Sequence, residues 1–530
     1  MARFLEIVLD VPASAMPAAR GRRRRPAGFA AALGDALPEL GAASVSGLRI
    51  DTVTFDRGGA LADAGWRIGV DAHGDAREVT VARRASPTPG IAAYTPIFSA
   101  PLDAAALANA LFAAAPAPFR DALAAAGELE PAAALVCERS RWPWSRDGVD
   151  VELVVDANLR AAGDDAPALH ELRVRALWPE PADPDDADDI DPAPLIDALF
   201  ARASDIVDVV PAFVRLDEAA VRAARGSLGG ERAAAYAAPV DLGRAQTTRA
   251  ALLAIGRNVS AQWFGNDAGA RASASTEFVH QMRVSQRRLR TAMRIFSRVA
   301  DDDWKTRIAP ELKWLRGLLG DARDLDVFVE STLPALAAAD LDSARWAAVL
   351  DKASAERADA RERVRDALAS ARYARVALAW LQWLATLARR DARDGHDGGA
   401  VRSLRAHARK RVRRYYRGLT GTPKLTAIND ATRHAVRIDA KYLRYTLEFF
   451  APIVSRKTRT GTARMLSRLQ SVLGDGNDAA VALRYLEALD VEPYQLGFAR
   501  GWCEAVKRYT AKEGERLLRE LRAPKIAGDA

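Results

Sequence analysis

The segment FVHQMRVSQRRLR at residues 278–290 decides how the rest of the chain is interpreted, because it combines four arginines and a histidine with an apolar helical pattern. A helix turns by about 100° per residue. The basic side chains then share one face, within roughly 80° of one another: His280, Arg283, Arg287, Arg290 and Arg294. Met282 and Leu289 lie on the opposite face. The segment therefore predicts an amphipathic helix with a basic stripe.

The same pattern returns 154 residues later, as HAVRIDAKYLR at 434–444. This second stripe has Glu448 in place of a fifth basic residue and otherwise consists of His434, Arg437, Lys441 and Arg444. At the same offset, LRGLLGDARDLDV (315–327) matches LQSVLGDGNDAAV (469–481). Two blocks that share one offset indicate a tandem duplication. We expect the two copies to pack about a pseudo-twofold axis, with both stripes lining one groove.

The two stripes predict a binding surface for a polyanion. Like charges on one helix face cost roughly a few tenths of a kcal/mol per pair, so a sequence that stacks them twice is expected to neutralise an anion. Arginine suits phosphate because its planar fork donates two hydrogen bonds at once. Four further cations precede the LGD motifs and are candidates for the same surface: Lys313, Arg316, Arg464 and Arg468. The alternative is that each stripe is an ordinary solvated helix face.

The histidines that open the stripes do not suggest catalysis, because no carboxylate partner is identifiable by spacing and the chain has no His-x-x-x-His metal pair. We expect them to hydrogen-bond within the phosphate surface; a phosphorylated histidine is the alternative. The aspartates of the LGD blocks are expected to sit at helix junctions, as caps or as partners of the arginines rather than as metal ligands: Asp321, Asp324, Asp475 and Asp478.

Charge and hydropathy divide the chain into two parts. Residues 1–240 carry 24 Lys+Arg against 35 Asp+Glu, a net of −11, whereas residues 241–530 carry 53 against 34, a net of +19. Such an asymmetry points to a polyanionic partner for the second part. From about residue 245 the sequence reads as long helices, with breaks expected at Pro310, Gly320, Pro334, 395–399, 421–423, Pro452, Gly474 and Gly476.

The first part mixes strands and helices. Alternating or β-branched segments predict strands at 4–11, 48–55, 65–71, 76–84, 149–156 and 170–178, and an Ala-rich segment predicts a helix at 103–115. The chain is therefore expected to contain an α+β domain at 1–205, a linker at 206–244 and an all-helical domain at 245–522.

Composition excludes several classes of protein. Two cysteines support neither a disulfide framework nor a cysteine zinc site. No apolar run approaches the ~20 residues that span a bilayer, and Glu6 and Asp10 interrupt what would be the apolar part of a signal peptide. We therefore expect a soluble, cytoplasmic protein without a membrane partner.

The helical part closely resembles the CHAD family of conserved-histidine helical domains. The resemblance covers roughly residues 245–522 and rests on VHQMRVSQRRLR and ELKWLRGLLGDARDLDVF in one half, and on HAVRIDAKYLRYTLEFF and LQSVLGDGNDAAVA in the other. It implies two helical bundles with internal twofold pseudosymmetry and a basic central surface. It also implies binding to inorganic polyphosphate and association with polyphosphate granules. The spacing of the stripes alone indicates only a polyanion.

The first ~200 residues resemble a CYTH domain, a β-tunnel in which acidic residues hold metal and basic residues hold triphosphate. FLEIVLDVP stands where that family has E-x-E-x-K, so Val8 and Asp10 depart from the pattern while Glu6 keeps it. Arg67 is kept, but Gly69 replaces the next arginine. The late E-x-E-x-E strand is present as Glu171, Arg173 and Arg175. A two-metal site needs clustered carboxylates, so the resemblance implies a degenerate tunnel that holds Mg²⁺ or Mn²⁺ only if it is active.

The leading hypothesis is thus a non-catalytic polyphosphate-binding protein that is associated with granules. Two alternatives stay open: a metal-dependent triphosphatase or polyphosphatase that uses the first domain, and a general scaffold for nucleic acid or other polyanions. Few aromatic residues interleave with the stripes, which disfavours stacking on single-stranded bases. The sequence leaves the oligomeric state open.

Overall fold

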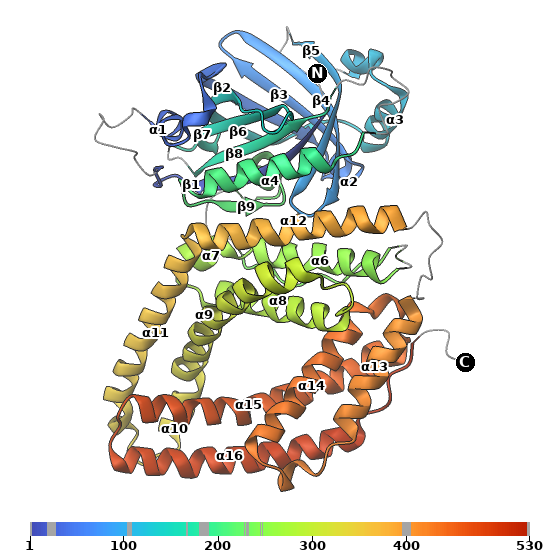
Figure 1. Ribbon diagram of the computed structural model, residues 1–530. Coiled ribbons are helices and arrows are strands. Elements are labelled where there is room, and N and C mark those ends of the chain that lie inside the picture. The colour runs from blue at the N-terminus through green and yellow to red at the C-terminus, as the bar shows by residue number, and fades with distance from the viewer. Residues whose placement is uncertain are drawn as a thin grey trace. The chain divides into compact units, whose positions relative to one another are not determined.

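The computed structural model describes residues 3–17, 28–102, 109–165, 168–179, 190–226, 228, 233–243, 245, 247–394 and 404–526. The chain divides into two compact units. One comprises residues 1–233 with 369–386, and the other comprises residues 234–368 with 387–530. We describe each unit by itself (Figure 1).

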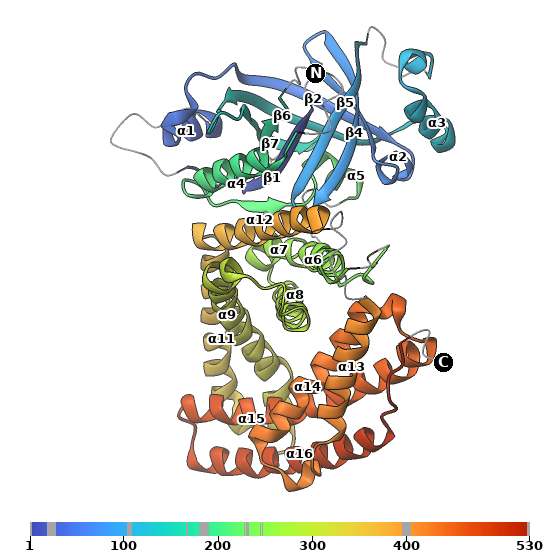
Figure 2. The ribbon, with the colours of Figure 1, turned by 45° about the vertical axis from the view of Figure 1, so that its right-hand side comes forward.

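The first unit is built on an antiparallel β-barrel. Its strands are β1 (Phe4–Pro12), β2 (Val45–Asp56), β3 (Trp66–His73), β4 (Ala76–Thr88), β5 (Ile91–Pro101), β6 (Glu130–Pro143), β7 (Val151–Ala161), β8 (Leu169–Leu177) and β9 (Phe213–Arg215). They run in the order β5-β4-β3-β2-β6-β7-β8-β1-β9, and β1 also pairs with β5, which closes eight strands into a ring (Figure 2). Helices α1 (Phe29–Ala36), α2 (Ala60–Asp63), α3 (Ala117–Ala126) and α4 (Ala193–Val207) accompany the barrel.

The alternation of β8 shows how the sequence forms this barrel. Successive side chains of a strand point to opposite faces. Leu172, Val174 and Ala176 are fully buried, and β8 packs against α4. The residues between them line the barrel interior, so Arg173 and Arg175 face inward. The barrel is therefore apolar outside, beneath the helix, and charged inside.

All six predicted strands are confirmed within a few residues. The sequence analysis missed β5, β6 and β9. Prolines interrupt β5 at Pro96 and Pro101, and alanines dominate the first half of β6, so neither shows the usual strand signal. Of the helix predicted at 103–115, the described part is a 3₁₀ helix at Asn109–Ala114.

Residues 213–226 pack within the barrel unit, although the sequence analysis gives them to a linker. They form β9, which pairs with β1, and helix α5 (Ala219–Ala224). Buried Arg215 donates from Nε to Asp10 Oδ2 at 2.9 Å. The first part of α12 (Ala371–Asp394) also belongs to this unit, where Leu381 packs on Gly90. The domain boundaries of the sequence analysis stay a prediction.

The second unit is all-helical. It contains α6 (Thr248–Phe264), α7 (Asp267–Ala272), α8 (Thr276–Ile295), α9 (Ala309–Val327), α10 (Leu333–Ala338), α11 (Ala347–Leu368), α13 (Leu404–Thr420), α14 (Asp430–Phe449), α15 (Ala463–Ala488) and α16 (Pro493–Glu520). Helices α15 and α16 lie side by side (Figure 1). In the described part of the chain no helix is long and apolar enough to cross a membrane.

The sequence duplication is also a duplication of structural elements. Helix α14 repeats both ends of α8 at the offset of 154 residues, and α15 repeats the start of α9. Each of α9 and α15 is preceded by a single π-helical turn, at Trp304–Ile308 and Thr458–Thr462. Even the N-caps correspond, since Ser275 and Asn429 each accept a hydrogen bond from the first turn. The two copies therefore present the basic stripes on equivalent helices.

The expected helix breaks at the LGD motifs are wrong. Gly320 lies inside α9, and Gly474 and Gly476 lie inside α15. Consequently the aspartates beside them are mid-helix residues and not caps. The breaks predicted at Pro310 and Pro334 are wrong as well: each proline follows a π-helical turn, at Trp304–Ile308 and Phe328–Thr332, and the helical backbone continues from that turn into α9 and α10. The break predicted at 395–399 lies outside the described residues.

Candidate functional site

Four cations from the two copies meet in the second unit, and we call them the central cationic cluster: Arg283 and Arg287 of α8 with Arg437 and Lys441 of α14. Helix α8 packs against α14. Burial lowers the pKa of Arg437, and the positive charges of Arg287 and Arg283 lower it further. Burial and the same neighbours lower the pKa of Lys441 to about 6. The two predicted stripes thus form one surface at their centres.

The cluster is only partly neutralised. Arg283 pairs with Asp324 of α9, with Nη2 and Oδ1 3.1 Å apart. Among the residues that the structure describes, Arg287, Arg437 and Lys441 form no ion pair, and the buried Nε atoms of both arginines lack a hydrogen-bond partner. A buried donor without a partner costs about 1–3 kcal/mol. Incoming acceptor oxygens would relieve this cost.

Gly320 explains how Arg283 reaches its place. A Cβ at position 320 would lie 2.6 Å from Arg283 Nη1, so a larger residue there would require the flexible end of the Arg283 side chain to shift. At the equivalent position of the second copy, a Cβ on Gly474 meets nothing within 4 Å. The two glycines therefore occupy equivalent positions, but only Gly320 lies against an arginine of the central cationic cluster.

We expect Gly474→Ala to stabilise the protein, because alanine favours a helix interior over glycine by up to about 1 kcal/mol. Gly320→Ala gains the same helix propensity but displaces Arg283 from Asp324, so its stability gain should be smaller and its polyanion affinity several-fold lower. Thermal unfolding and a binding titration of both variants test this. Equal behaviour of the two variants would contradict the role given to Gly320.

A second basic group lies further along α8. Burial and the charge of Arg290 lower the pKa of Arg316 to about 10. Arg294 stacks over the ring of Tyr442 at 4.6 Å and contacts its hydroxyl at 3.4 Å. Arg444, by contrast, donates to Gln470 Oε1 at 2.9 Å. The first stripe therefore continues toward its C-terminal end, whereas Arg444 of the second stripe is engaged within its own copy.

The two histidines differ between the copies. Burial and the charge of Arg323 lower the pKa of His280 to about 4, so this ring is neutral at pH 7. His434 is exposed, and its Nδ1 lies 3.0 Å from Asn477 Oδ1. In the described part of the chain neither ring hydrogen-bonds a carboxylate. Their role as hydrogen-bonding members of an anion surface stays a prediction.

The remaining predicted residues are not brought into the cluster. Lys313, Arg464 and Arg468 are exposed on α9 and α15. Arg468 acts electrostatically on Glu513 of α16. No described contact connects these three side chains to the central cationic cluster, and their part in binding stays a prediction.

Arg288 was not among the predicted site residues, although it joins three helices. Arg288 is fully buried and donates to Glu448 at 2.8 Å, Gln262 at 2.9 Å and Asn258 at 2.7 Å. It therefore joins α8 to α14 and α6. The signal was present in the sequence, since Glu448 stands where the second stripe lacks its fifth cation. Glu448 takes the place of a fifth cation in the second stripe because its carboxylate pairs with Arg288.

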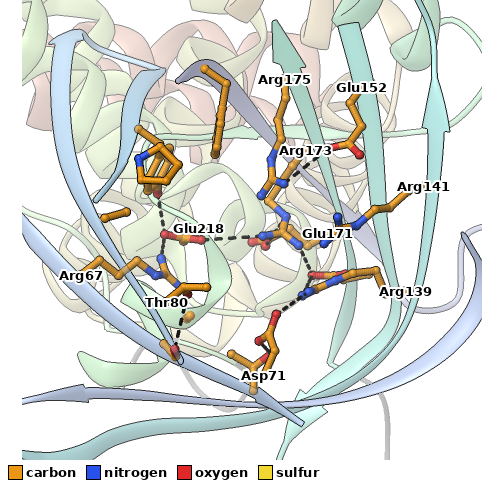
Figure 3. A pocket seen from close by; sticks show the side chains of 18 of the residues that line it. Arg67, Asp71, Thr80, Arg139, Arg141, Glu152, Glu171, Arg173, Arg175 and Glu218 are labelled. Carbon is orange, nitrogen blue, oxygen red and sulfur yellow. Dashed lines mark hydrogen bonds and ion pairs between the residues drawn. The ribbon is translucent and has the colours of Figure 1, made fainter. Parts of the chain in front are cut away.

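The barrel of the first unit encloses a cavity of about 680 Å³ (Figure 3). Its charged side chains neutralise one another. Arg139 donates to Asp156 at 2.7 Å and to Asp71 at 2.8 Å, and Arg173 also pairs with Asp156. Arg175 donates to Glu6 at 2.7 Å. Arg173 and Arg175 are thus ion-pair partners of Asp156 and Glu6.

Further carboxylates are engaged in the same way. Glu218 pairs with Arg67 and accepts from the hydroxyl of Tyr94 at 2.6 Å. Glu171 accepts from the backbone of Ala219, and burial raises its pKa to about 7. In the described ranges no group of three or more His, Cys, Asp or Glu side chains is placed to hold a metal ion. Carboxylates already paired with buried guanidinium groups do not fit a divalent cation, so we derive no hydrolytic step from this cavity.

Comparison with known proteins supports the interpretation of the helical unit. Residues 254–487 match the family model described as CHAD domain. No curated protein matches the chain. A crystal structure of the CHAD domain from the plant Ricinus communis is 27% identical, and the match covers 56% of this chain and 100% of that one with a TM-score of 0.48.

Two further solved structures are similar at lower identity. PptA from Streptomyces chartreusis is 20% identical over 52% of this chain and 99% of its own, with a TM-score of 0.37. HpAC1 from Hippeastrum, described as having a dominant triphosphatase activity, is 14% identical over 42% of this chain and 97% of its own, with a TM-score of 0.26.

Proposed function

Because residues 254–487 form a CHAD domain, we propose that this chain binds inorganic polyphosphate through the central cationic cluster and acts without catalysing a reaction on it. The choice of polyphosphate among polyanions follows from the resemblance to that family. Association with polyphosphate granules in the cytoplasm belongs to the same proposal.

The observation that carries the proposal is the meeting of unpaired cations from both copies. Arg287, Arg437 and Lys441 come from two helices that are distant in sequence and share one surface. Like charges held close together in partly buried positions repel one another, and a bound anion would offset this cost. Phosphate oxygens would accept from the unpartnered Nε atoms of the two arginines.

The stripe on α8 also has the dimensions of a linear ligand. From His280 to Arg294 it extends about 21 Å along the helix axis. Arg290 and Arg294 at its far end are exposed. A chain of several phosphates lying along α8 would therefore contact the central cationic cluster and then these two arginines, with one phosphate contact for each turn of the helix.

Lys441 makes the binding dependent on pH. Its pKa of about 6 leaves the side chain mostly neutral at pH 7 in the free protein. A bound polyanion favours the charged form and raises this pKa, so binding takes up a proton. Affinity should increase as pH falls from 8 toward 6, by up to about tenfold per pH unit, and should level off below 6.

Titration calorimetry in two buffers of different ionisation enthalpy measures this proton uptake. Lys441→Met should reduce the uptake and flatten the pH dependence. The buried neutral ring of His280, with a pKa of about 4, does not titrate in this range. The same proton uptake in wild type and Lys441→Met would show that Lys441 is not in the site.

The dependence on salt tests the proposal itself. A site that neutralises several phosphates releases counterions, so the logarithm of the affinity should fall linearly with the logarithm of salt concentration. We expect a slope of about −3 to −6, since Arg287, Arg437 and, once binding has protonated it, Lys441 lie in the central cationic cluster and further arginines lie along α8. A slope near zero would contradict a charge-based site.

A further inference from the structure

The second copy contains a pocket of about 590 Å³ beside the central cationic cluster. It is lined by α14, α15 and α16, and Arg437 belongs both to the pocket and to the cluster. Leu473, Thr510 and Ala511 also line it, and all three are buried in the packing of α15 against α16. These buried side chains therefore form one packed wall of the pocket.

The pocket carries an excess of positive charge. Its basic residues are Arg433, His434, Arg437, Arg484 and Lys507. Three carboxylates oppose them. Asp430 pairs with Arg433 and accepts from Lys507 Nζ at 2.9 Å, Glu504 also pairs with Lys507 at 2.9 Å, and the charge of Asp478 acts on Arg437. Arg484 is exposed and, like Arg437, forms no ion pair within the described residues. Two guanidinium groups are thus available to an anion in this pocket.

The equivalent positions of the first copy have the opposite charge. Ala480 and Arg484 correspond at the common offset to Asp326 and Glu330. Asp326 is buried and accepts from Arg361 Nε at 3.0 Å, and Glu330 pairs with Arg357 at 3.4 Å. The first copy therefore places paired carboxylates where the second leaves space and a free cation. The basic pocket is a property of the second copy.

We propose that this pocket binds the terminal phosphate of a polyphosphate chain whose body lies on the central cationic cluster; the inference rests on the function proposed above. A terminal phosphate differs from an internal one in carrying a second ionisable oxygen. It therefore has the larger charge, and it is bonded to the chain on one side only. A basic pocket beside the central cationic cluster, with two available arginines, matches the larger charge.

Chains of one length with native ends or with ends capped as phosphoramidates of a small amine test this inference, because capping replaces one terminal oxygen by an amine, which removes the second charge of the end and leaves the internal phosphates unchanged. The full-length protein should bind native-ended chains about tenfold more tightly. Arg484→Ala should remove this preference by weakening only the binding of native-ended chains. Arg290→Ala, which removes a cation from the stripe on α8, should weaken both ligands equally.

Arg363→Ala on α11 is the control for net charge, since this exposed arginine lies outside the pocket and the stripes. It should keep the preference for native ends. Equal binding of native-ended and capped chains by the wild type, or equal weakening of both by Arg484→Ala, would overturn the terminal site and leave polyphosphate binding intact. Failure of the wild type to bind either chain would instead overturn the proposed function.

Discussion

Replacing Arg287 and Arg437 together by glutamate is expected to reduce polyphosphate affinity by about a thousandfold or more. Each arginine presents a buried Nε without a partner to the central cationic cluster. A hydrogen bond to a charged group contributes about 1.5–3 kcal/mol. Losing two such bonds removes about 3–6 kcal/mol, and the introduced carboxylates repel the ligand in addition. Titration of purified protein with long-chain polyphosphate measures the loss.

The control makes the same change of net charge elsewhere. Arg363 and Arg365 are exposed on α11, outside the stripes. Their double replacement by glutamate should change affinity only through the long-range field, by no more than about threefold at moderate salt. Thermal unfolding of both double variants confirms that each is folded. If both double variants lose the same affinity, binding depends on net charge and not on the central cationic cluster.

Asp156→Ala should destabilise the barrel by about 3–5 kcal/mol. This buried carboxylate pairs with both Arg139 and Arg173, so its removal leaves Arg139 with Asp71 alone and deprives Arg173 of its closest carboxylate. The arginine charges hold the pKa of Asp156 well below its usual value, although burial opposes them. The stabilisation is therefore complete above the unfolded pKa and is lost as pH falls through the folded one. Denaturant unfolding at neutral pH and in acid measures it.

Glu152→Ala is the matched control in the same cavity. Its side chain is 26% exposed and lies 3.6 Å from Arg175, which keeps Glu6 as a closer partner at 2.7 Å. Removing this weaker, hydrated pair should cost about 1 kcal/mol or less. A loss for Asp156→Ala no larger than that of Glu152→Ala would contradict the view that the buried acids of this cavity serve as structural partners of arginine.

Much of the fold could be predicted from local patterns. Alternation found six strands of the barrel, and the two blocks at one offset found the duplication of the helical part. Strands β5 and β6 were missed because barrel closure pairs them regardless of weak local preference. The glycines of the LGD motifs were misread as helix ends, since the reason for Gly320 is the side chain of Arg283, which lies 37 residues earlier in the chain.

The sequence predicted which basic residues share a helix face, but not which of them meet in the central cationic cluster. Helical spacing places the cations of each stripe on one face, yet it cannot say that Arg444 is engaged by Gln470 or that Lys313 lies apart. These outcomes depend on tertiary neighbours. Nor could spacing reveal the pocket of the second copy, because Lys507 of α16 enters it from outside the repeated motifs.

Binding of a phosphate chain is expected to require one site that the helices of both copies form together. The most direct test is polyphosphate binding by the purified full-length protein at low and high salt, with double-stranded DNA of equal total charge as competitor. We predict tight binding that weakens steeply with salt and that DNA does not displace. Ready displacement by DNA would contradict the account, because it would show a general basic surface on the two helices and not a site built for phosphate chains.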